Sequence, residues 1–410
     1  MDINQSLALL AGLSPAQFMR QYWQKKPLLV RQAIPGFQPL LSRAALVKLA
    51  TFEHVESRLI VQQPKGWRMK QGPIAARSLP PLSKDGWTLL VQGVDMHDAG
   101  AHALLQQFRF APDARLDDLM ISFATTGGGV GPHFDSYDVF LLQASGRRRW
   151  RIGQQKDLTL QQGVPLKILQ NFEPDQEFLL EAGDMLYLPP GYAHDGVAEA
   201  AIGSDGKAAD CMTYSVGFRV PIRNVLAAEL LHRLAEFSED AVDTAPVEGR
   251  RRAAPLARLY RDPGQPATAT PAALPAALVT FAQQAVVQAL KDPLAISCAL
   301  GECMTEPKPS VLFDEPLQAW APDAAKAHQT SIRLDARTRM LYDSDHVFIN
   351  GESYRAKGAD ATLMRRLADQ RGLSAHELSK ASVSAVALLG EWHDAGWLQQ
   401  ERHGLPGANT

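Results

Sequence analysis

The feature that most constrains the fold is a close series of short β-type runs between residues 87 and 219. In order, the runs are WTLLVQG, LMISFAT, DVFLLQ, RRRWRIG, EFLLEAG, DMLYLPP, HDGVAE and MTYSVGF. Many short strands with turn signals between them predict a β-sandwich or barrel rather than a parallel βαβ sheet. Glycine at the tight position of QASGRR (143–148) and of LEAGDM (180–185) predicts two hairpin turns. Residues 199–209 are expected to form a loose insertion.

The segments on either side predict helices. Ser14 is followed by Pro15 and, three residues after the serine, by Gln17, which is the pattern of a capped helix start. A second short helix is expected over 41–49, and short strands over 28–30 and 58–61. Downstream of the β-rich region, apolar periodicity predicts helices over residues 222–238 and 274–290, with a partly ordered connection over 239–271.

The C-terminal part mixes strands and helices. SIRLDARTRMLYD and HVFINGESYRA predict strands, and Asn350-Gly351 is a hairpin-turn dipeptide. TLMRRLADQRG and SAVALLGEWHDAGWLQ predict helices, and the combination is typical of a winged helix. We therefore predict three parts: a catalytic domain over 1–221 with its core at about 87–219, a helical region over 222–308, and a winged-helix-like domain over 309–410.

Composition narrows the class of protein. The chain has 410 residues, 46% of them hydrophobic and 21% charged, and 42 basic against 44 acidic side chains give a formal net charge of −2. This balance does not favour a nucleic-acid or membrane partner. The three cysteines are too few for a disulfide framework and indicate a reducing compartment. Without a recognisable signal peptide or an apolar run of about 18 residues, the protein is expected to be cytoplasmic.

Two histidines and an aspartate are the candidate metal ligands. His133 and Asp135 lie in GGGVGPHFDSYDVF, and side chains two residues apart on a strand project to the same face. His194, in LPPGYAHDG just after an expected strand, is the third candidate. Each motif alone is common, so their combination in a strand-rich segment carries the prediction. Two histidines and one carboxylate leave coordination positions open, which suits Fe(II), O2 and a bidentate cosubstrate.

The run RRRWR (147–151) supplies a candidate anchor for an acidic cosubstrate. Strand alternation places Arg148 and Trp150 on one face, and Arg147, Arg149 and Arg151 on the other. Because Trp150 belongs in a barrel interior, Arg148 is expected to point inward as well. A buried arginine without an anion is costly, and a guanidinium can bind a carboxylate through two parallel hydrogen bonds. We expect Arg148 to bind the far carboxylate of 2-oxoglutarate and the other three arginines to form an outward basic stripe.

The strand before the His-x-Asp motif provides further candidates. Asp118, Ser122 and Ala124 share one of its faces. Ser122 is a candidate donor to the cosubstrate carboxylate, although a core serine bonded to the backbone is the usual alternative; Ala124 has no hydroxyl to offer. Asp118 is the candidate for binding a cationic group of the substrate. Tyr137 follows the metal motif on the same face and is expected to contact the substrate.

Three longer stretches resemble the Jumonji-C oxygenases: GGGVGPHFDSYDVFLLQASGRRRWRIG, EAGDMLYLPPGYAHDG and MTYSVGFRVP. They are more similar still to the bacterial ribosomal oxygenases that hydroxylate an arginine of large-subunit ribosomal protein sixteen. With PAQFMRQYWQKKPLLVRQA near the N-terminus, the resemblance covers most of the chain. It implies an α+β fold with a mainly β catalytic core, a double-stranded β-helix, followed by a helical dimerisation region and a C-terminal winged-helix domain.

The resemblance also implies the chemistry. Fe(II), 2-oxoglutarate and O2 would be the cofactor and cosubstrates, and succinate and CO2 the co-products. By position, His133, Asp135 and His194 correspond to the iron ligands and Arg148 to the 2-oxoglutarate anchor, where many relatives have lysine. The implied partners are a ribosomal protein substrate and a second copy of the chain in a homodimer.

Two other functions stay open on the residues alone. A cupin-type metalloenzyme that does not use 2-oxoglutarate would give Arg148 little purpose, and CO2 release dependent on 2-oxoglutarate separates the two classes. A winged-helix regulator with a vestigial barrel would bind DNA through the tail. The tail helices mix charges of both signs, which is more typical of a protein-binding surface, so no direct DNA binding is expected. These side chains are Arg365, Arg366, Arg371, Asp369, Glu377 and Glu391.

Overall fold

A computed structural model describes most of the chain. The described residues are 2–64, 66–202, 209–243, 260–261, 266, 272–321, 330–355 and 357–402. Two compact units are present, and each is treated by itself: unit 1 is Met1–Val220 with Pro309–Leu312, and unit 2 is Pro221–Lys308 with Phe313–Thr410. Most of the predicted connection over 239–271 and residues 203–208 of the predicted insertion lie outside the described residues. The three-part division remains a prediction.

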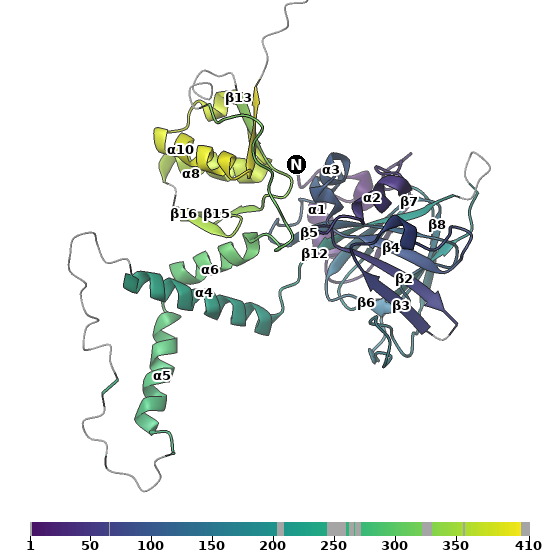
Figure 1. Cartoon of the computed structure of the whole chain (residues 1–410), viewed down its shortest axis with the longest axis horizontal. Helices are drawn as coiled ribbons and strands as arrows, with labels where there is room; N and C mark the ends of the chain where they lie inside the picture. The colour runs from purple at the N-terminus through teal and green to yellow at the C-terminus, as the bar shows by residue number, and fades with distance from the viewer. Residues whose placement is uncertain are drawn as a thin grey trace, which may run out of the picture. The chain divides into compact units, whose positions relative to one another are not determined.

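Unit 1 is built on two antiparallel sheets (Figure 1). The larger has the order β1-β10-β7-β12-β5-β4-β2-β3, and the smaller β6-β11-β8-β9. The strands of the large sheet are β1 (Leu28–Val30), β2 (Ser57–Gln63), β3 (Gly66–Gln71), β4 (Trp87–Val91), β5 (Leu116–Ala124), β7 (Asp138–Ser145), β10 (Met185–Leu188) and β12 (Cys211–Phe218). Those of the small sheet are β6 (His133–Phe134), β8 (Arg147–Gly153), β9 (Gln176–Leu180) and β11 (Ala193–Glu199). The predicted double-stranded β-helix is confirmed.

The two predicted hairpins are wrong, because consecutive strands lie in different sheets. QASGRR joins β7 to β8, yet β7 pairs with β10 and β12 while β8 pairs with β9 and β11. LEAGDM likewise carries the chain from β9 in the small sheet to β10 in the large one. The glycines are still needed: Gly146 has φ 63° and Gly183 has φ 92°, which a residue with a side chain rarely adopts. Both turns therefore close the barrel rather than a local strand pair.

Alternation along each strand gives the large sheet two apolar faces. Its outer face packs against α1 (Pro15–Gln21), α2 (Arg43–Leu49) and α3 (Ala99–Gln106), with Phe18 fully buried against the rings of Phe140 on β7 and Tyr187 on β10. Its inner face, with β8, β9 and β10, forms a separate interior cluster made of Val139, Leu141, Trp150, Ile152, Leu180, Leu186 and Leu188. The predicted cap at Ser14 is a complete capping box with Gln17. Helix α3 and the short 3-10 turns η1 (Ala8–Leu10), η2 (Ala76–Ser78) and η3 (Val94–Met96) were not predicted.

Unit 2 begins with three helices: α4 (Arg223–Asp243), α5 (Ala276–Ala289) and α6 (Pro293–Thr305). The predictions for α4 and α5 are confirmed, whereas α6 was not expected. Helix α6 starts at a sequence signal that could have revealed it, since Asp292 caps it and Pro293 is its first residue. In Figure 1, α4 and α6 lie side by side, and an ion pair joins Arg233 to Glu306 at the end of α6.

The rest of unit 2 is the predicted winged helix. One small sheet has the order β17-β13-β18 and the other β14-β15-β16, and α8 (Gly358–Gln370), α9 (Ala375–Leu378) and α10 (Val383–Asp394) complete it. Its strands are β13 (Thr330–Leu334), β14 (Met340–Tyr342), β15 (His346–Ile349), β16 (Glu352–Arg355), β17 (Gly372–Leu373) and β18 (Leu398–Arg402). The hairpin at Asn350-Gly351 is confirmed, with φ of 48° and 92°.

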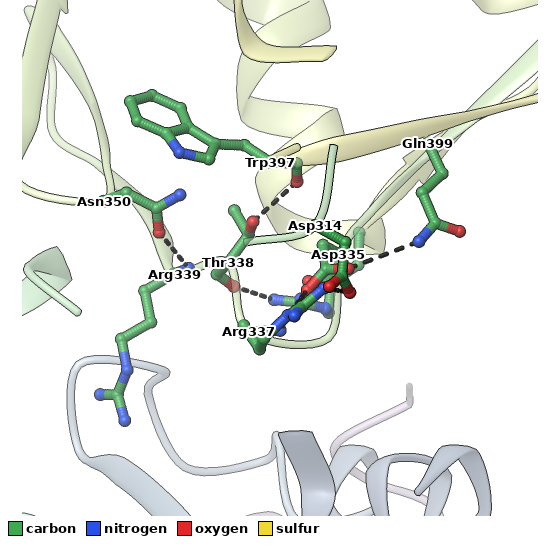
Figure 2. A network of polar contacts seen from close by, with 9 residues as sticks. Asp314, Asp335, Arg337, Thr338, Arg339, Asn350, Trp397 and Gln399 are labelled. Carbon is green, nitrogen blue, oxygen red and sulfur yellow. Dashed lines mark hydrogen bonds and ion pairs between the residues drawn. The ribbon is translucent and has the colours of Figure 1, made fainter. Parts of the chain in front are cut away.

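Polar side chains fix the turn between β13 and β14 (Figure 2). Arg337 donates from Nε to Asp335 Oδ1 at 2.7 Å and from Nη2 to Asp335 Oδ2 at 2.9 Å, and the same Nη2 reaches Asp314 at 2.8 Å. Thr338 Oγ1 donates to the Trp397 carbonyl at 2.7 Å. The network ties the turn between β13 and β14 to Trp397, the residue just before β18.

Candidate active site

The three predicted metal ligands come together at one end of the small sheet. His133 on β6 and His194 on β11 are direct cross-strand partners, and their ring centroids are 4.2 Å apart. Asp135 lies one residue past the end of β6 and places Oδ2 3.6 Å from His194 Nε2. The backbone oxygen of Asp135 accepts a hydrogen bond from the Gly191 N–H at 2.8 Å, which fixes the loop on that side. All three ligand atoms lie within 4.8 Å of one another.

The two imidazoles are held in the form that binds a metal. His133 Nδ1 lies 2.8 Å from the Gly131 carbonyl, and His194 Nδ1 lies 2.9 Å from the Tyr192 carbonyl. A carbonyl only accepts, so each Nδ1 carries the proton and each Nε2 keeps its lone pair for a metal. Burial, aided by the neighbouring His133 and opposed by Asp135, lowers the pKa of His194 to about 4. His194 is therefore neutral at neutral pH, and its contact with Asp135 is a pair of ligands rather than a salt bridge.

Arg148 is buried in the barrel, as predicted, with 4% of its surface exposed. Its register partners are Leu180 on β9 and Ala198 on β11, neither of which can accept a hydrogen bond through its side chain. Nη1 makes one long bond of 3.4 Å to the Gly196 carbonyl, while Nε and Nη2 have no acceptor among the described residues. Each buried unpaired donor costs about 1–3 kcal/mol. The guanidinium thus fits an acidic ligand, because no carboxylate among the described residues pairs with it.

The other arginines of β8 face outward, as predicted, but they are not an unpaired stripe. Arg149 makes ion pairs with Glu177 and Glu199, and Arg151 pairs with Asp195. These carboxylates come from β9 and β11, the two strands that flank β8. Arg149 and Arg151 are therefore neutralised across the sheet, whereas Arg147 donates from Nη2 to the Ala200 carbonyl at 2.8 Å.

Trp150 lies between the arginine and the metal ligands. Its ring centroid is 5.9 Å from that of His194, and Arg148 lies over the same indole at 5.8 Å. The residue opposite Trp150 on β11 is Gly196, where an added Cβ would be only 2.5 Å from the indole ring. The glycine makes room for the indole, which in turn forms one wall of the space between Arg148 and His194.

The structure places Tyr137 beside the metal ligand Asp135, and Asp118 and Ser122 on β5. Tyr137 is 39% exposed, and its phenol is hydrogen-bonded to Asp135, which together with burial raises the pKa of Tyr137. Asp118 is buried on β5, where Oδ2 accepts from the Gly93 N–H at 3.0 Å, and its charge also acts on the Tyr137 phenol. Ser122 donates to the Thr213 carbonyl at 3.3 Å. The hydroxyl of Ser122 thus has a backbone partner, and all three roles remain predictions.

Sequence reasoning missed two polar features of the barrel. Asp95 in η3 is buried beside Asp118, and it accepts from the Leu119 N–H at 2.8 Å. Burial, helped by the charge of Asp118, raises the pKa of Asp95 to about 7. In the interior, Thr213 Oγ1 donates to Gln143 Oε1 at 2.8 Å. Strand alternation alone would have placed Gln143 inside, whereas no local signal pointed to Asp95.

Comparison with known proteins decides the family. Residues 103–226 match the JmjC domain model, and residues 288–399 match the ROXA-like winged helix model. The ribosomal protein uL16 3-hydroxylase of Escherichia coli is 32% identical over 389 residues, which cover 93% of this chain and 96% of that protein. The chain belongs to the JmjC ribosomal oxygenase family.

None of the described helices has the length and apolarity needed to span a membrane.

Solved structures of the family have the same fold over the whole chain. YcfD, a ribosomal oxygenase from Escherichia coli in complex with cobalt and 2-oxoglutarate, has a TM-score of 0.74 at 29% identity and covers 94% of this chain and 98% of its own. A probable ribosomal oxygenase of Haemophilus influenzae is 34% identical, but over only 51% of this chain and 50% of its own length. Fe(II), 2-oxoglutarate and O2 are the cofactor and cosubstrates of this enzyme class, and the His133, Asp135 and His194 cluster fits them.

Proposed function

We propose that this 2-oxoglutarate-dependent oxygenase hydroxylates an arginine side chain of a large-subunit ribosomal protein. The observation that carries the proposal is a buried Arg148 with unpaired N–H groups in the same barrel as an open three-ligand metal site. Neither a cupin-type enzyme without 2-oxoglutarate nor a DNA-binding regulator needs this arginine. The substrate class rests on the similarity to a uL16 hydroxylase over nearly the whole chain.

In this proposal the protein residues bind and orient the reactants. His133, Asp135 and His194 would hold the iron, and Arg148 would bind the far carboxylate of 2-oxoglutarate, with Ser122 as a second donor. When bound, the iron with 2-oxoglutarate and O2 supplies the oxidising power: one oxygen atom enters a substrate C–H bond, and the other enters succinate as CO2 leaves. Trp150 and the apolar interior keep bulk water away from Arg148, which strengthens its electrostatic attraction for a carboxylate.

Asp118 and Tyr137 are the proposed contacts for the substrate arginine. A carboxylate and a phenol are both acceptors for a guanidinium, which has only donors. Because one oxygen of Asp118 already accepts from the Gly93 N–H, its geometry is set before the substrate arrives. The raised pKa of Tyr137 keeps its phenol protonated, so it can accept from a guanidinium while it donates to Asp135. Both side chains would orient the arginine towards the metal ligands.

The proposal is tested by mass spectrometry of ribosomal-protein peptides after incubation with the enzyme, Fe(II) and 2-oxoglutarate. The expected result is a single added oxygen on one arginine, lost in His133→Ala. In Asp118→Asn we expect hydroxylation to fall at least tenfold while 2-oxoglutarate still binds. An added oxygen on another residue type would refute the arginine assignment, and unchanged hydroxylation in Asp118→Asn would remove the role of Asp118.

We also propose that the protein forms a homodimer through the helices of unit 2. Several large apolar side chains there are 40% or more exposed: Val225, Leu231, Val279, Val286 and Val287. Soluble proteins rarely leave such groups uncovered, and a second copy presents the same surface in a two-fold arrangement. Light scattering should give twice the chain mass, and Val286→Asp with Val287→Asp should give the monomer mass. A monomeric parent protein at micromolar concentration would refute the dimer.

The cellular site follows from the same proposal. A ribosomal protein substrate is available in the cytoplasm, and the lack of a disulfide at Cys211, Cys298 and Cys303 is compatible with a reducing compartment. We therefore propose a cytoplasmic enzyme without membrane association, in which the winged helix does not read DNA sequence.

A further inference from the structure

The winged helix contains a surface cavity lined mainly by cations. Its volume is about 390 Å³, and Arg355, Lys357 and Arg365 contribute its basic side chains. Asp345 is its one carboxylate, so the charged lining has three positive groups and one negative. The remaining lining residues are small or polar: Ser344, Gly358, Ala361 and Thr362. The cavity is thus electropositive, concave and free of large apolar side chains.

Hydrogen bonds fix the positions of the two arginines of the cavity. Arg365 donates from Nη2 to the Ser344 carbonyl at 2.7 Å and lies over the Tyr342 ring at 5.7 Å. Arg355 donates from Nε to His346 Nε2 at 3.4 Å. Two guanidinium groups are therefore held at the rim of the cavity while most of their donors stay available. The Asp345 carboxylate, in contrast, is partly engaged, because it accepts from the Ser344 hydroxyl at 2.7 Å.

The backbone adds to the positive field in the cavity. Helix α8, of 13 residues, begins at Gly358, and no side chain caps its N-terminus at Lys357. Gly358 lines the cavity, so the first-turn peptide N–H groups lie beside the three cations. A helix N-terminus carries a partial positive charge and favours an anion next to it.

We infer that this cavity binds a phosphate group of an RNA strand. Two arginine forks, one lysine and a helix N-terminus in one concavity match the charge and hydrogen-bond acceptors of a phosphate. Because the cavity opens at the surface, a phosphate that belongs to a polymer can enter it. The choice of RNA rests on the proposed function, since a ribosomal protein substrate is found with ribosomal RNA; the phosphate site itself rests only on the cavity. Contacts to phosphate carry no base specificity, which agrees with the absence of DNA sequence reading proposed above.

The test measures binding of the full-length protein to a fluorescent single-stranded RNA by anisotropy at several salt concentrations. Thr362→Glu puts a carboxylate into the cavity, and Lys357→Glu reverses one of its charges. Lys380→Glu makes the same change of net charge as Lys357→Glu at an exposed position outside the cavity lining. We expect affinity for RNA to fall about tenfold or more in the two cavity variants and less than twofold in Lys380→Glu. The slope of log affinity against log salt should shrink by about one for each lost phosphate contact.

Three controls make the outcome decisive. Circular dichroism should show that the variants remain folded, and 2-oxoglutarate turnover with a peptide substrate should be unchanged in all of them, which separates this inference from the proposed function. Inorganic phosphate at millimolar concentration should compete with the RNA. Equal RNA affinity in Lys357→Glu, Thr362→Glu and Lys380→Glu would overturn the site. If inorganic phosphate raises the melting temperature of the protein but no RNA binding is detected, the assignment to RNA is overturned.

Discussion

Replacing Arg148 with methionine should stabilise the protein without ligand while abolishing its response to 2-oxoglutarate. In the barrel, Nε and Nη2 of Arg148 are buried without an acceptor among the described residues. At about 1–3 kcal/mol for each unpaired donor, the guanidinium costs the empty protein roughly 2–6 kcal/mol. Methionine fills a similar volume without these donors, and exchanging a buried charge for an apolar group is often stabilising. With some loss from imperfect packing, we expect a net gain of about 2 kcal/mol, or about 4–8 °C in melting temperature for a unit of this size.

The same substitution should weaken the binding of 2-oxoglutarate. A carboxylate bound by two charge-assisted hydrogen bonds gains about 1.5–3 kcal/mol from each of them. Removing both should weaken 2-oxoglutarate by about 3–6 kcal/mol, which corresponds to roughly 10²- to 10⁴-fold in Kd. The metal ligands are untouched by the substitution, so metal binding should persist.

The assay is a thermal melt of the cobalt-loaded protein with and without 2-oxoglutarate. Arg149→Met is the matched control on the same strand, because Arg149 faces outward and pairs with Glu177 and Glu199. Its melting temperature should stay close to that of the parent, because exposed ion pairs contribute little to stability, and it should keep its full response to 2-oxoglutarate. An Arg148→Met protein that melts lower than the parent, yet is still stabilised by 2-oxoglutarate, would refute the reasoning that Arg148 is held unpaired for a carboxylate.

Three further predictions concern the surroundings of the site. The pKa of Asp95 is raised from 3.8 to about 7 in the folded protein, so Asp95 destabilises the fold progressively as pH rises through this range. In urea denaturation, the parent protein should lose about 2–3 kcal/mol of stability between pH 5 and pH 8 because of this group, and Asp95→Asn should abolish that loss. A pH profile that is the same in both proteins would contradict the raised pKa. Gly196→Ala puts Cβ 2.5 Å from the Trp150 indole, so it should lower the free energy of unfolding by about 1–3 kcal/mol and reduce kcat. Full activity at the stability of the parent protein would show that the indole can move to make room. Arg337→Ala removes the guanidinium from the buried Asp335, which keeps the N–H of residue 337 and the Gln399 amide as donors, and should cost about 1–3 kcal/mol in the winged helix while 2-oxoglutarate turnover is kept. Loss of turnover in the folded variant would mean that the network of Figure 2 acts beyond its own unit.

The parts of the molecule predicted correctly from sequence are those set by local rules. The capping box at Ser14 needs only residues within one helical turn, and the Asn350-Gly351 hairpin needs only two residues that tolerate positive φ. The His133, Asp135 and His194 cluster was found because His133 and Asp135 lie two residues apart in one glycine-rich motif and His194 lies in a second motif just after an expected strand.

The errors arose where a local signal has more than one global outcome. A glycine between two strands predicts a tight reversal, but it does not say which sheet the second strand joins. Gly146 and Gly183 both make such reversals, and both carry the chain from one sheet to the other. The choice is made by long-range pairing, in which β7 gains two neighbours from distant sequence, and no pattern within the turn records it. Asp95 was missed for the same reason, because Asp118, the carboxylate whose charge helps to raise its pKa, lies 23 residues away on another element.

Strand alternation predicted that Arg148 points inward, but it could not show why this arginine differs from its neighbours. The difference lies in the flanking strands. Arg149 has carboxylates diagonally opposite it on β9 and β11, whereas Arg148 has Leu180 and Ala198 directly opposite. The sheet thus provides carboxylates for Arg149 and Arg151 on its outward face, whereas Arg148 on the inward face has no carboxylate partner among the described residues. Because a buried guanidinium is costly without a compensating anion, the unpaired N–H groups of Arg148 favour an acidic ligand as its partner.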